Sequence, residues 1–198
     1  MTAAAIIAAW DQADPSAIHP TRAIDEDAYW NSGINQAALI GTVLQPGCKV
    51  VDFGCGDGRV AIPLRELGYD VTAVDASQTM LDRLHQRDPD MPAVLNPGPG
   101  LYATLGKKAD AVVALAVLIH HNYADCLDLL AELRQAVKLG GTLVLDWPVS
   151  DEPVEGQAWL EVTTWSQQAH DDACARIGLK PVDAALPWGV YKAVKAGG

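Results

Sequence analysis

Three closely spaced glycines with two aspartates beside them form the segment of this sequence best suited to binding a ligand. Gly54, Gly56 and Gly58 follow an apolar run; Asp52 precedes the first glycine and Asp57 the last. Glycine adopts backbone conformations that other residues resist, so a ligand can approach the main chain closely. A helix that begins after such a turn adds unpaired N–H groups and the positive end of its dipole. The alternative is a tight strand-to-helix turn without a ligand.

The spacing and charge of this loop discriminate between two kinds of ligand. Dinucleotide-binding loops follow the pattern G-x-G-x-x-G and hold a pyrophosphate at the helix end. Here the third glycine comes one residue early, and Asp52 and Asp57 would repel a pyrophosphate. The same charges suit a ligand that carries an ammonium and a sulfonium group. A nicotinamide-dependent oxidoreductase is therefore the weaker hypothesis.

A further aspartate, Asp75, ends the next apolar run of the chain, Val71–Val74. An acidic side chain at the end of the second strand can accept hydrogen bonds from both hydroxyls of a ribose, as it does in dinucleotide-binding folds. Taken alone, Asp75 could equally cap the helix that follows it. Its place downstream of the glycine loop favours ribose binding.

The elements that must position these residues follow from the hydrophobic pattern. Short apolar runs alternate with helical segments through the middle of the chain, which favours a parallel sheet covered by helices on both faces. The pattern predicts strands at residues 49–53, 70–74, 93–95, 109–114 and 142–147, and helices at 59–67, 77–86 and 123–137. The pair Gly140-Gly141 is expected to end the last of these helices.

The two ends of the chain have a different pattern. Residues 1–12 predict one helix, and residues 24–44 predict one or two helices broken near Gly33. A helix at 166–177 and two strands at 179–185 and 190–194 are expected near the C-terminus, and the short turn between these strands suits an antiparallel pair. We therefore expect a single domain, residues 1–198, built from a helical N-terminal cap (1–45), a cofactor-binding core (46–147) and a C-terminal helix and strand hairpin (148–198).

Composition excludes several classes of protein. The 198 residues are 49% hydrophobic and 20% charged, which is typical of a globular domain. A net charge of −11 argues against a basic nucleic-acid-binding face. No C-x-x-C pair occurs among the four cysteines, so no metal site is expected. The sequence has no signal peptide and no apolar run long enough to span a bilayer, which predicts a cytoplasmic location without membrane contact.

The chain resembles the class I S-adenosylmethionine-dependent methyltransferases in four segments that occur in the family's order. Val51–Gly58 (VDFGCGDG) is similar to the glycine-rich first motif, and Val74–Ser77 (VDAS) to the second. Lys108–Ala114 followed by Ile119–His121 resembles the fourth-strand motif, and Leu133–Leu145 resembles the helix, glycine turn and fifth strand. The resemblance implies a Rossmann-like α/β fold with a seven-stranded, mostly parallel sheet, helices on both faces and an antiparallel C-terminal strand.

The resemblance also implies which residues bind the cofactor, S-adenosylmethionine. The three glycines would face its methionine part, Asp52 would hold its amino group, and Asp75 would bind its ribose. Ala76 and Met80 would flank the adenine, and Asn96 would contact the edge of the ring. The full set of expected cofactor-binding residues is Asp52, Gly54, Cys55, Gly56, Gly58, Asp75, Ala76, Met80, Asn96 and Ala114. The alternative for Cys55 is a purely structural role, as a small side chain packed within the loop.

The acceptor side of the site is predicted from aromatic residues and histidines. His120 and His121 follow the fourth predicted strand, where the family's acceptor pocket opens, and either could act as a general base. The alternative is a loop histidine that bonds to backbone. Tyr29 and Trp30 could cover the sulfonium or the acceptor, because aromatic faces attract cations. Trp147 could line the acceptor pocket, although tryptophan packs in the core more often.

The resemblance therefore predicts a methyltransferase that acts on an unidentified small-molecule acceptor. The Asn/Asp-Pro-Pro-Tyr/Phe stretch typical of adenine N-methyltransferases is replaced by Leu115–His120, which argues against a nucleic-acid partner. Methyl transfer needs chiefly alignment and exclusion of water, and no metal. The alternative is a non-catalytic S-adenosylmethionine-binding protein that acts as a sensor or as a subunit of a complex. The sequence leaves the oligomeric state open.

Overall fold

A seven-stranded sheet forms the centre of the computed structural model, which describes residues 3–12, 25–158 and 160–197. The strands lie in the order β3-β2-β1-β4-β5-β7-β6. Neighbours from β3 to β5 pair in parallel, and β7 lies antiparallel to both β5 and β6. The strands are β1 (Lys49–Phe53), β2 (Asp70–Asp75), β3 (Ala93–Leu95), β4 (Ala109–Ala114), β5 (Val137–Leu145), β6 (Leu179–Val182) and β7 (Gly189–Ala193). The predicted fold class is thereby confirmed.

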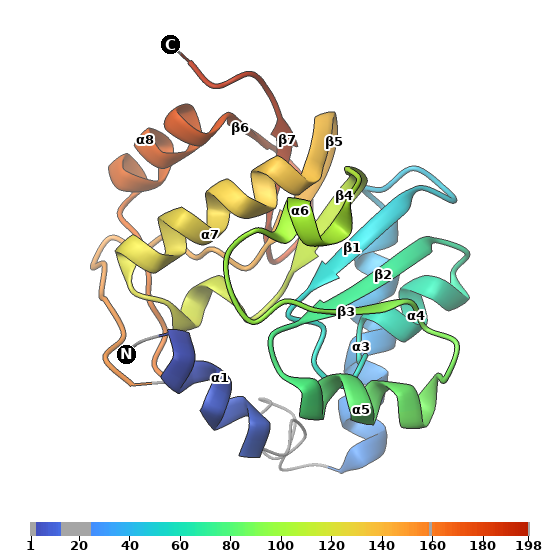
Figure 1. Cartoon of the computed structure of the whole chain (residues 1–198). Helices are drawn as coiled ribbons and strands as arrows, with labels where there is room; N and C mark the ends of the chain where they lie inside the picture. The colour runs from blue at the N-terminus through green and yellow to red at the C-terminus, as the bar shows by residue number, and fades with distance from the viewer. Residues whose placement is uncertain (1–2, 13–24, 159, 198) are drawn as a thin grey trace.

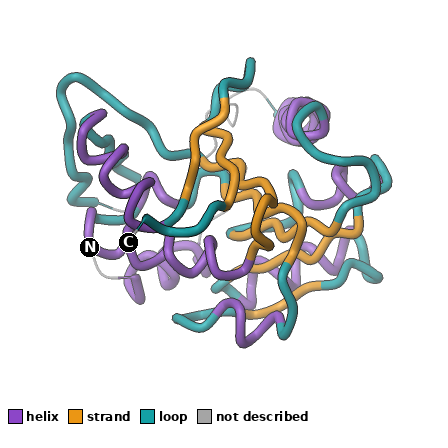
Figure 2. The backbone as a smooth tube through the Cα atoms, turned by 90° about the horizontal axis from the view of Figure 1, so that it is seen from above, coloured by secondary structure: helices purple, strands orange, loops and turns teal. Residues whose placement is uncertain are grey.

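Helices cover both faces of this sheet (Figures 1 and 2). One face packs against α6 (Leu101–Leu105), α7 (Tyr123–Ala136) and α8 (Gln167–Ile177). The other face packs against α3 (Glu26–Gly41), α4 (Ala61–Glu66) and α5 (Gln78–Arg87). The first helix, α1 (Ala3–Gln12), lies across the carboxyl ends of the parallel strands instead (Figure 1).

The parallel strands build two separate hydrophobic cores because their side chains alternate between the faces. Val51 and Val112 lie in the core under α7, whereas their neighbours Val50 and Val113 lie in the core under α3 and α4. All four are at most 3% exposed. Burial on both faces explains why the sequence of these strands is a near-continuous apolar run.

Short polar side chains fix where the helices begin. Ser77 accepts a hydrogen bond from the Met80 N–H at 3.1 Å and starts α5. Asn122 does the same for α7, and Ser166 for α8. Each cap satisfies one of the helix's otherwise unpaired N–H groups. The caps thus set the direction from which the preceding loops leave the sheet.

The predicted start of the fifth strand at residue 142 was wrong, and so was the expectation that a glycine pair ends the preceding helix. α7 ends at Ala136 and β5 begins at once with Val137, so the pair Gly140-Gly141 lies inside the strand and not at a helix end. The pairing of β5 with β4 shifts register across this stretch. A Cβ on Gly141 would lie 2.6 Å from the Asp110 carbonyl oxygen, so the glycine allows the two strands to approach. The short helix α6 was not predicted at all.

The predicted break near Gly33 was also wrong, because α3 is continuous from Glu26 to Gly41. A Cβ on Gly33 would lie 1.9 Å from the Arg59 carbonyl oxygen. The glycine therefore serves close packing of α3 against the segment that leads into α4. In consequence α3 belongs to the layer that covers the sheet.

Among the described residues, no helix is both long and apolar enough to cross a membrane.

Replacing Gly33 by Ala is expected to destabilise the protein, although alanine favours an isolated helix by about 1 kcal/mol over glycine. The added methyl group meets backbone that cannot rotate away, and overpacking of this kind costs about 1–3 kcal/mol. The control is Gly41→Ala in the same helix, where the nearest atom to the new methyl is the Tyr69 hydroxyl at 3.3 Å. Urea unfolding should show a lower midpoint for Gly33→Ala only; equal midpoints for the two variants would contradict this account.

Candidate functional site

A cavity of about 1070 Å³ opens at the carboxyl ends of the parallel strands. Typical ligand pockets measure roughly 300–1,000 Å³, so this cavity has room for a large ligand or two smaller ones. The strand order reverses between β1 and β4, which is the place where open α/β sheets bind ligands. One residue at or just after the end of each parallel strand lines the cavity: Asp52 (β1), Asp75 (β2), Asn96 (β3), Leu115 (β4) and Asp146 (β5).

The glycine loop after β1 forms one wall of the cavity. Gly54, Gly56 and Gly58 have φ angles of 72°, 56° and 90°, in the region that favours glycine. A Cβ on Gly54 would lie 2.3 Å from the Val117 side chain, whereas a Cβ on Gly56 would meet nothing within 4 Å. Gly54 therefore allows close packing with the loop after β4, and Gly56 leaves its backbone open to a ligand.

Asp75 ties this loop to the second strand. One of its carboxylate oxygens, Oδ2, accepts a hydrogen bond from the Gly56 N–H at 2.8 Å, and Oδ1 accepts one from the Ser77 N–H at 2.9 Å. Burial raises the pKa of this carboxyl group, and the backbone donors oppose that shift. Asp75 thus holds Gly56 and the start of α5 together while it lines the cavity.

Asp52 places a buried carboxylate in the same cavity. It is 4% exposed, and its Oδ2 has no hydrogen-bond partner among the described residues. Burial raises its pKa to about 7; the positive charge of Arg59 opposes this rise, and Asp75 adds to it. A buried, unpaired carboxylate is costly, so this position favours a ligand that brings a positive charge or a hydrogen-bond donor.

The second aspartate of the loop, Asp57, is engaged by a side chain of the N-terminal segment. Tyr29 donates its hydroxyl hydrogen to the Asp57 Oδ1 at 2.8 Å. The Arg59 guanidinium lies 5.4 Å from the centre of the Tyr29 ring and donates hydrogen bonds to Ser32 and Gln36. Tyr29 and Arg59 both line the cavity. The sequence predicted Tyr29 there but not Arg59, whose position next to the glycine loop was the available signal.

Both predicted histidines lie at the cavity, in and after the short 3₁₀ helix Leu118–His120. Burial lowers the pKa of His120 and of His121. The Nδ1 atom of each has no hydrogen-bond partner in the described part of the chain. The Trp10 ring of α1 stands edge-on to His120, with 6.2 Å between the ring centres. Neutral imidazoles in such a place can accept a proton.

The remaining predicted cofactor residues divide into two groups. Cys55, Ala76, Met80 and Asn96 line the cavity together with the residues above. Gly58 and Ala114 are not among the lining residues. Gly58 instead packs against Ile62 and Leu84, and Ala114 is fully buried at the end of β4.

Two predicted acceptor residues, Trp30 and Trp147, are likewise not brought to the cavity. The Trp30 ring of α3 instead stacks with the Arg87 guanidinium of α5, whose central carbon lies 3.9 Å from the ring centre. Trp147 is 4% exposed and packs against Trp165 and His170 in the core under α7. Asp146 and Trp147 directly follow β5, and the alternation of that strand continues through them. Trp147 shares the core of Leu143 and Leu145, whereas Asp146 lines the cavity.

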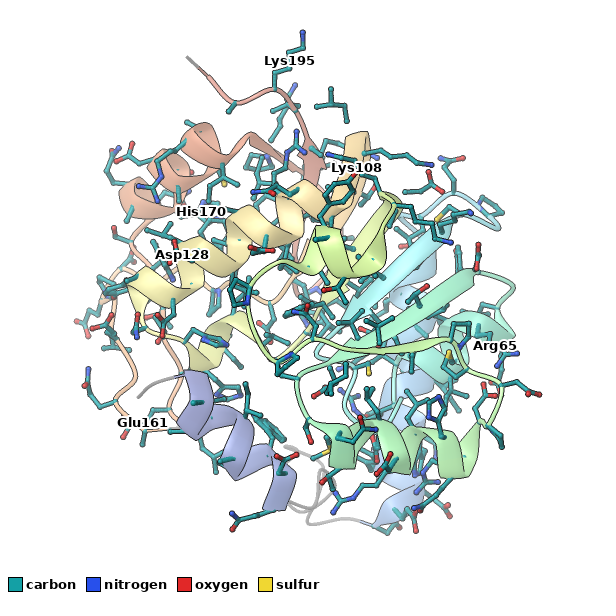
Figure 3. The ribbon with its side chains drawn as sticks, in the orientation of Figure 1. Arg65, Lys108, Asp128, Glu161, His170 and Lys195 are labelled. Atoms are coloured by element: carbon teal, nitrogen blue, oxygen red, sulfur yellow. The ribbon has the colours of Figure 1, made fainter. Side chains whose placement is uncertain are left out.

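Several lining residues were missed from the sequence. They are Ile6, Ile7 and Trp10 of α1, Leu160 and Val162 of the segment after β5, and the acidic residues Asp125, Asp128, Glu132 and Asp146. The labelled Asp128 lies on α7 (Figure 3). Within the described ranges, no three His, Cys, Asp or Glu side chains are placed to hold a metal ion.

Comparison with known proteins places this geometry among methyltransferases. A family model described as "Methyltransferase domain" matches residues 50–141. The probable S-adenosyl-L-methionine-dependent methyltransferase TehB of Haemophilus influenzae is 26% identical over 149 residues, 65% of this chain and 51% of that protein. An uncharacterized methyltransferase of Mycobacterium bovis is 36% identical over 122 residues, 60% of each chain. The chain thus spans about half to three-fifths of the length of these relatives.

Solved structures show the same fold. The crystal structure of magnesium protoporphyrin IX methyltransferase (ChlM) from Synechocystis PCC 6803 with bound SAM superposes with a TM-score of 0.70 at 17% identity, over 98% of this chain and 97% of that one. The glycopeptide N-methyltransferase MtfA gives a TM-score of 0.63 at 19% identity, over 82% and 90% of the two chains. At these identities the likeness concerns the fold.

The raised pKa of Asp52 predicts a pH dependence of stability in the ligand-free protein. Its pKa rises from its usual 3.8 in the unfolded chain to about 7 in the native state. Between these values the native state binds more protons, so the free energy of unfolding falls as pH rises from about 4 to about 7. Asp52→Asn should remove this loss and stabilise the protein at pH 8 by up to a few kcal/mol, because each pKa unit corresponds to about 1.4 kcal/mol.

Urea unfolding of Asp52→Asn and wild type at pH 5, 6, 7 and 8 measures this difference. The exposed Asp70→Asn, on the neighbouring strand, is the matched control and should track wild type. A stability gain for Asp52→Asn that is the same at pH 5 and pH 8 would show that its carboxylate does not titrate in this range.

Proposed function

We propose that this chain is a class I S-adenosylmethionine-dependent methyltransferase and that it transfers a methyl group to a small-molecule acceptor. The cofactor of this family is S-adenosylmethionine. The names of similar proteins include a magnesium protoporphyrin methyltransferase and a glycopeptide N-methyltransferase, and neither acts on nucleic acid by its name. They support a small organic acceptor for this chain.

The observation that carries the proposal is a pair of carboxylates, buried Asp52 and half-buried Asp75, on either side of the open glycine backbone. Asp52 offers an unpaired oxygen where the cofactor's amino group would lie, and Asp75 stands at the end of the next strand to receive the ribose hydroxyls. Gly56 leaves space at the main chain between them. These three features match a zwitterionic amino acid joined to a nucleoside.

Most of the other predicted cofactor residues would contact the cofactor in this proposal, and two would support the site by packing. Cys55 and Gly54 would continue the methionine side, and Ala76, Met80 and Asn96 would surround the adenine. Asn96 is held by its own contacts, since its Nδ2 donates to the Gly98 carbonyl at 2.8 Å. Gly58 and Ala114 would support the site without touching the cofactor: Gly58 by its packing within the loop, and Ala114 by its packing at the end of β4. Trp30 and Trp147 are left out of the acceptor site, and Tyr29 stays in it.

For methyl transfer the protein must mainly align the cofactor with the acceptor and exclude water from the cavity. The cofactor supplies a methyl group already activated by a sulfonium, and orientation of the partners can contribute about 7–11 kcal/mol. Ile6 and Trp10 of α1 line the cavity from the side opposite the sheet and would exclude water. His120 or His121 would take the proton from an acceptor that must lose one, because burial keeps both imidazoles neutral near pH 7.

The size and lining of the cavity favour an enzyme over a non-catalytic cofactor sensor. A sensor needs space for its cofactor alone, whereas this cavity extends to the histidines and to the ends of β4 and β5. Formation of S-adenosylhomocysteine with any acceptor would separate the two functions. The division into cap, core and C-terminal part, a cytoplasmic location and the absence of a nucleic-acid partner stay predictions.

Substitution of Asp75 is expected to weaken cofactor binding strongly. Asp75→Asn keeps the shape of the side chain but removes the charge that would accept two ribose hydroxyls. Hydrogen bonds to charged groups contribute about 1.5–3 kcal/mol, so we expect S-adenosylhomocysteine to bind roughly 10- to 100-fold more weakly. Calorimetric titration of wild type and variant with S-adenosylmethionine and S-adenosylhomocysteine measures the change.

The matched control is Asp70→Asn at the other end of the same strand, where the carboxylate is exposed and lies 3.7 Å from the Lys49 ammonium. It should bind both ligands like wild type. If folded wild-type protein bound neither ligand, the proposed function would be refuted. Wild-type affinity in Asp75→Asn would refute the role given to Asp75 alone.

A further inference from the structure

Asp146 is a carboxylate of the cavity that the cofactor does not use in the proposed function. It directly follows β5, and the order β3-β2-β1-β4-β5 places it on the far side of β4 from Asp75. The adenosine and amino-acid groups of the cofactor are assigned to the ends of β1, β2 and β3. Asp146 therefore belongs to the half of the cavity left for the acceptor.

The backbone holds this side chain in place without neutralising it. The Asp146 N–H donates to the Ala114 carbonyl at 3.0 Å, and its Oδ2 accepts a long hydrogen bond of 3.3 Å from the Ala116 N–H. Its Oδ1 has no hydrogen-bond donor among the described residues. The residue is half-buried, and burial raises the pKa of the carboxyl group. One oxygen of a positioned carboxylate is thus free to meet a ligand.

The cavity that Asp146 lines has many apolar side chains, and the other charged groups that line it are mostly acidic. Apolar walls come from α1, from the loop after β4 and from the segment after β5: Ile6, Ile7, Trp10, Val117, Ile119, Leu160 and Val162. Asp125 and Asp128 of α7 add negative charge. Among the described lining residues the one guanidinium or ammonium group is Arg59, and its Nη1 is already bonded to Ser32 and Gln36.

We propose that Asp146 selects a cationic amine with an apolar body as the acceptor, by pairing with the protonated nitrogen before that nitrogen gives its proton to His120 or His121. A carboxylate in a partly dry pocket attracts a cation more strongly than it would in water. An anionic acceptor would instead meet several acidic groups, with Arg59 as the one guanidinium or ammonium group among the described lining residues. The inference rests on the proposed function, since it names the acceptor class of that same cavity.

The test uses three probes of one shape and different charge: 2-phenylethylamine, 2-phenylethanol and 3-phenylpropionate. Their binding to protein saturated with S-adenosylhomocysteine is measured by ligand-observed NMR titration at pH 7.5. We expect the amine to bind at least about tenfold more tightly than the alcohol, which corresponds to about 1.4 kcal/mol of charge pairing. The carboxylate probe should bind most weakly.

Three variants assign the preference to Asp146. Asp146→Asn retains an oxygen for the Ala116 N–H and should bind amine and alcohol equally, whereas Asp146→Glu keeps the charge and should keep most of the preference. Asp128→Asn removes an acidic group from the same cavity and should also keep it. Retained affinity for S-adenosylhomocysteine shows that each variant is folded.

Three results would overturn the inference. The first is a wild-type protein that binds the amine no better than the alcohol, or binds none of the probes. The second is an amine preference that survives in Asp146→Asn or is lost equally in Asp128→Asn. The third is an Asp146→Asn variant that loses affinity for S-adenosylmethionine but not for S-adenosylhomocysteine, because the carboxylate would then face the sulfonium. Failure of wild type to bind S-adenosylhomocysteine would instead refute the proposed function.

Discussion

The two hydrogen bonds that the Asp75 carboxylate accepts hold the ligand-binding end of the sheet together. One comes from Gly56 in the loop after β1 and the other from Ser77 at the start of α5. Ser77 in turn caps α5 through the Met80 N–H and donates to Asp11 of α1. A single carboxylate thereby joins the glycine loop, the second strand, its helix and the helix that covers the cavity. The cofactor side of the cavity depends on this junction.

The acceptor side depends on close packing between the loops after β1 and β4. Gly54 has no side chain where Val117 presses against it, and Ala116 takes a φ of 55°, which is uncommon for a residue other than glycine. The Asp146 carboxylate accepts from the Ala116 N–H and supports this conformation. The two halves of the cavity are thus held in the same way: an aspartate at a strand end accepts a hydrogen bond from a backbone N–H of the neighbouring loop.

Much of this arrangement could be predicted from local patterns. The strand-glycine-helix sequence and the spacing to Asp75 depend on nearest neighbours in the chain, and both sides of the cofactor site followed from them. The interruption expected at Gly33 was wrong because the reason for that glycine is a backbone contact with Arg59, which no local pattern reveals. The start of β5 was missed for the same kind of reason, because Gly141 is required by its close approach to the Asp110 backbone on the neighbouring strand β4.

The acceptor side was harder to predict because its residues come from segments far apart in the sequence. Trp147 was predicted in the acceptor pocket, but the alternation of β5 continues past its last residue, so Trp147 packs in the core and its neighbour Asp146 lines the cavity. Trp10 reaches His120 only because α1 crosses the strand ends, a placement that follows from tertiary packing.

The acidic groups in the cavity lower the stability of the ligand-free protein, but they favour the binding of a positively charged ligand. Asp52 is buried and Asp75 is half-buried, and burial raises the pKa of both carboxyl groups. Asp75 adds to the rise at Asp52, and Arg59 opposes that rise only in part. A core that served stability alone would replace these carboxylates with apolar side chains. Their presence makes sense when a ligand brings the missing positive charge and hydrogen-bond donors, because the binding free energy then includes the relief of that strain. The same reasoning separates the two aspartates of the glycine loop: Asp57 is satisfied within the protein by Tyr29, whereas Asp52 is left for the ligand.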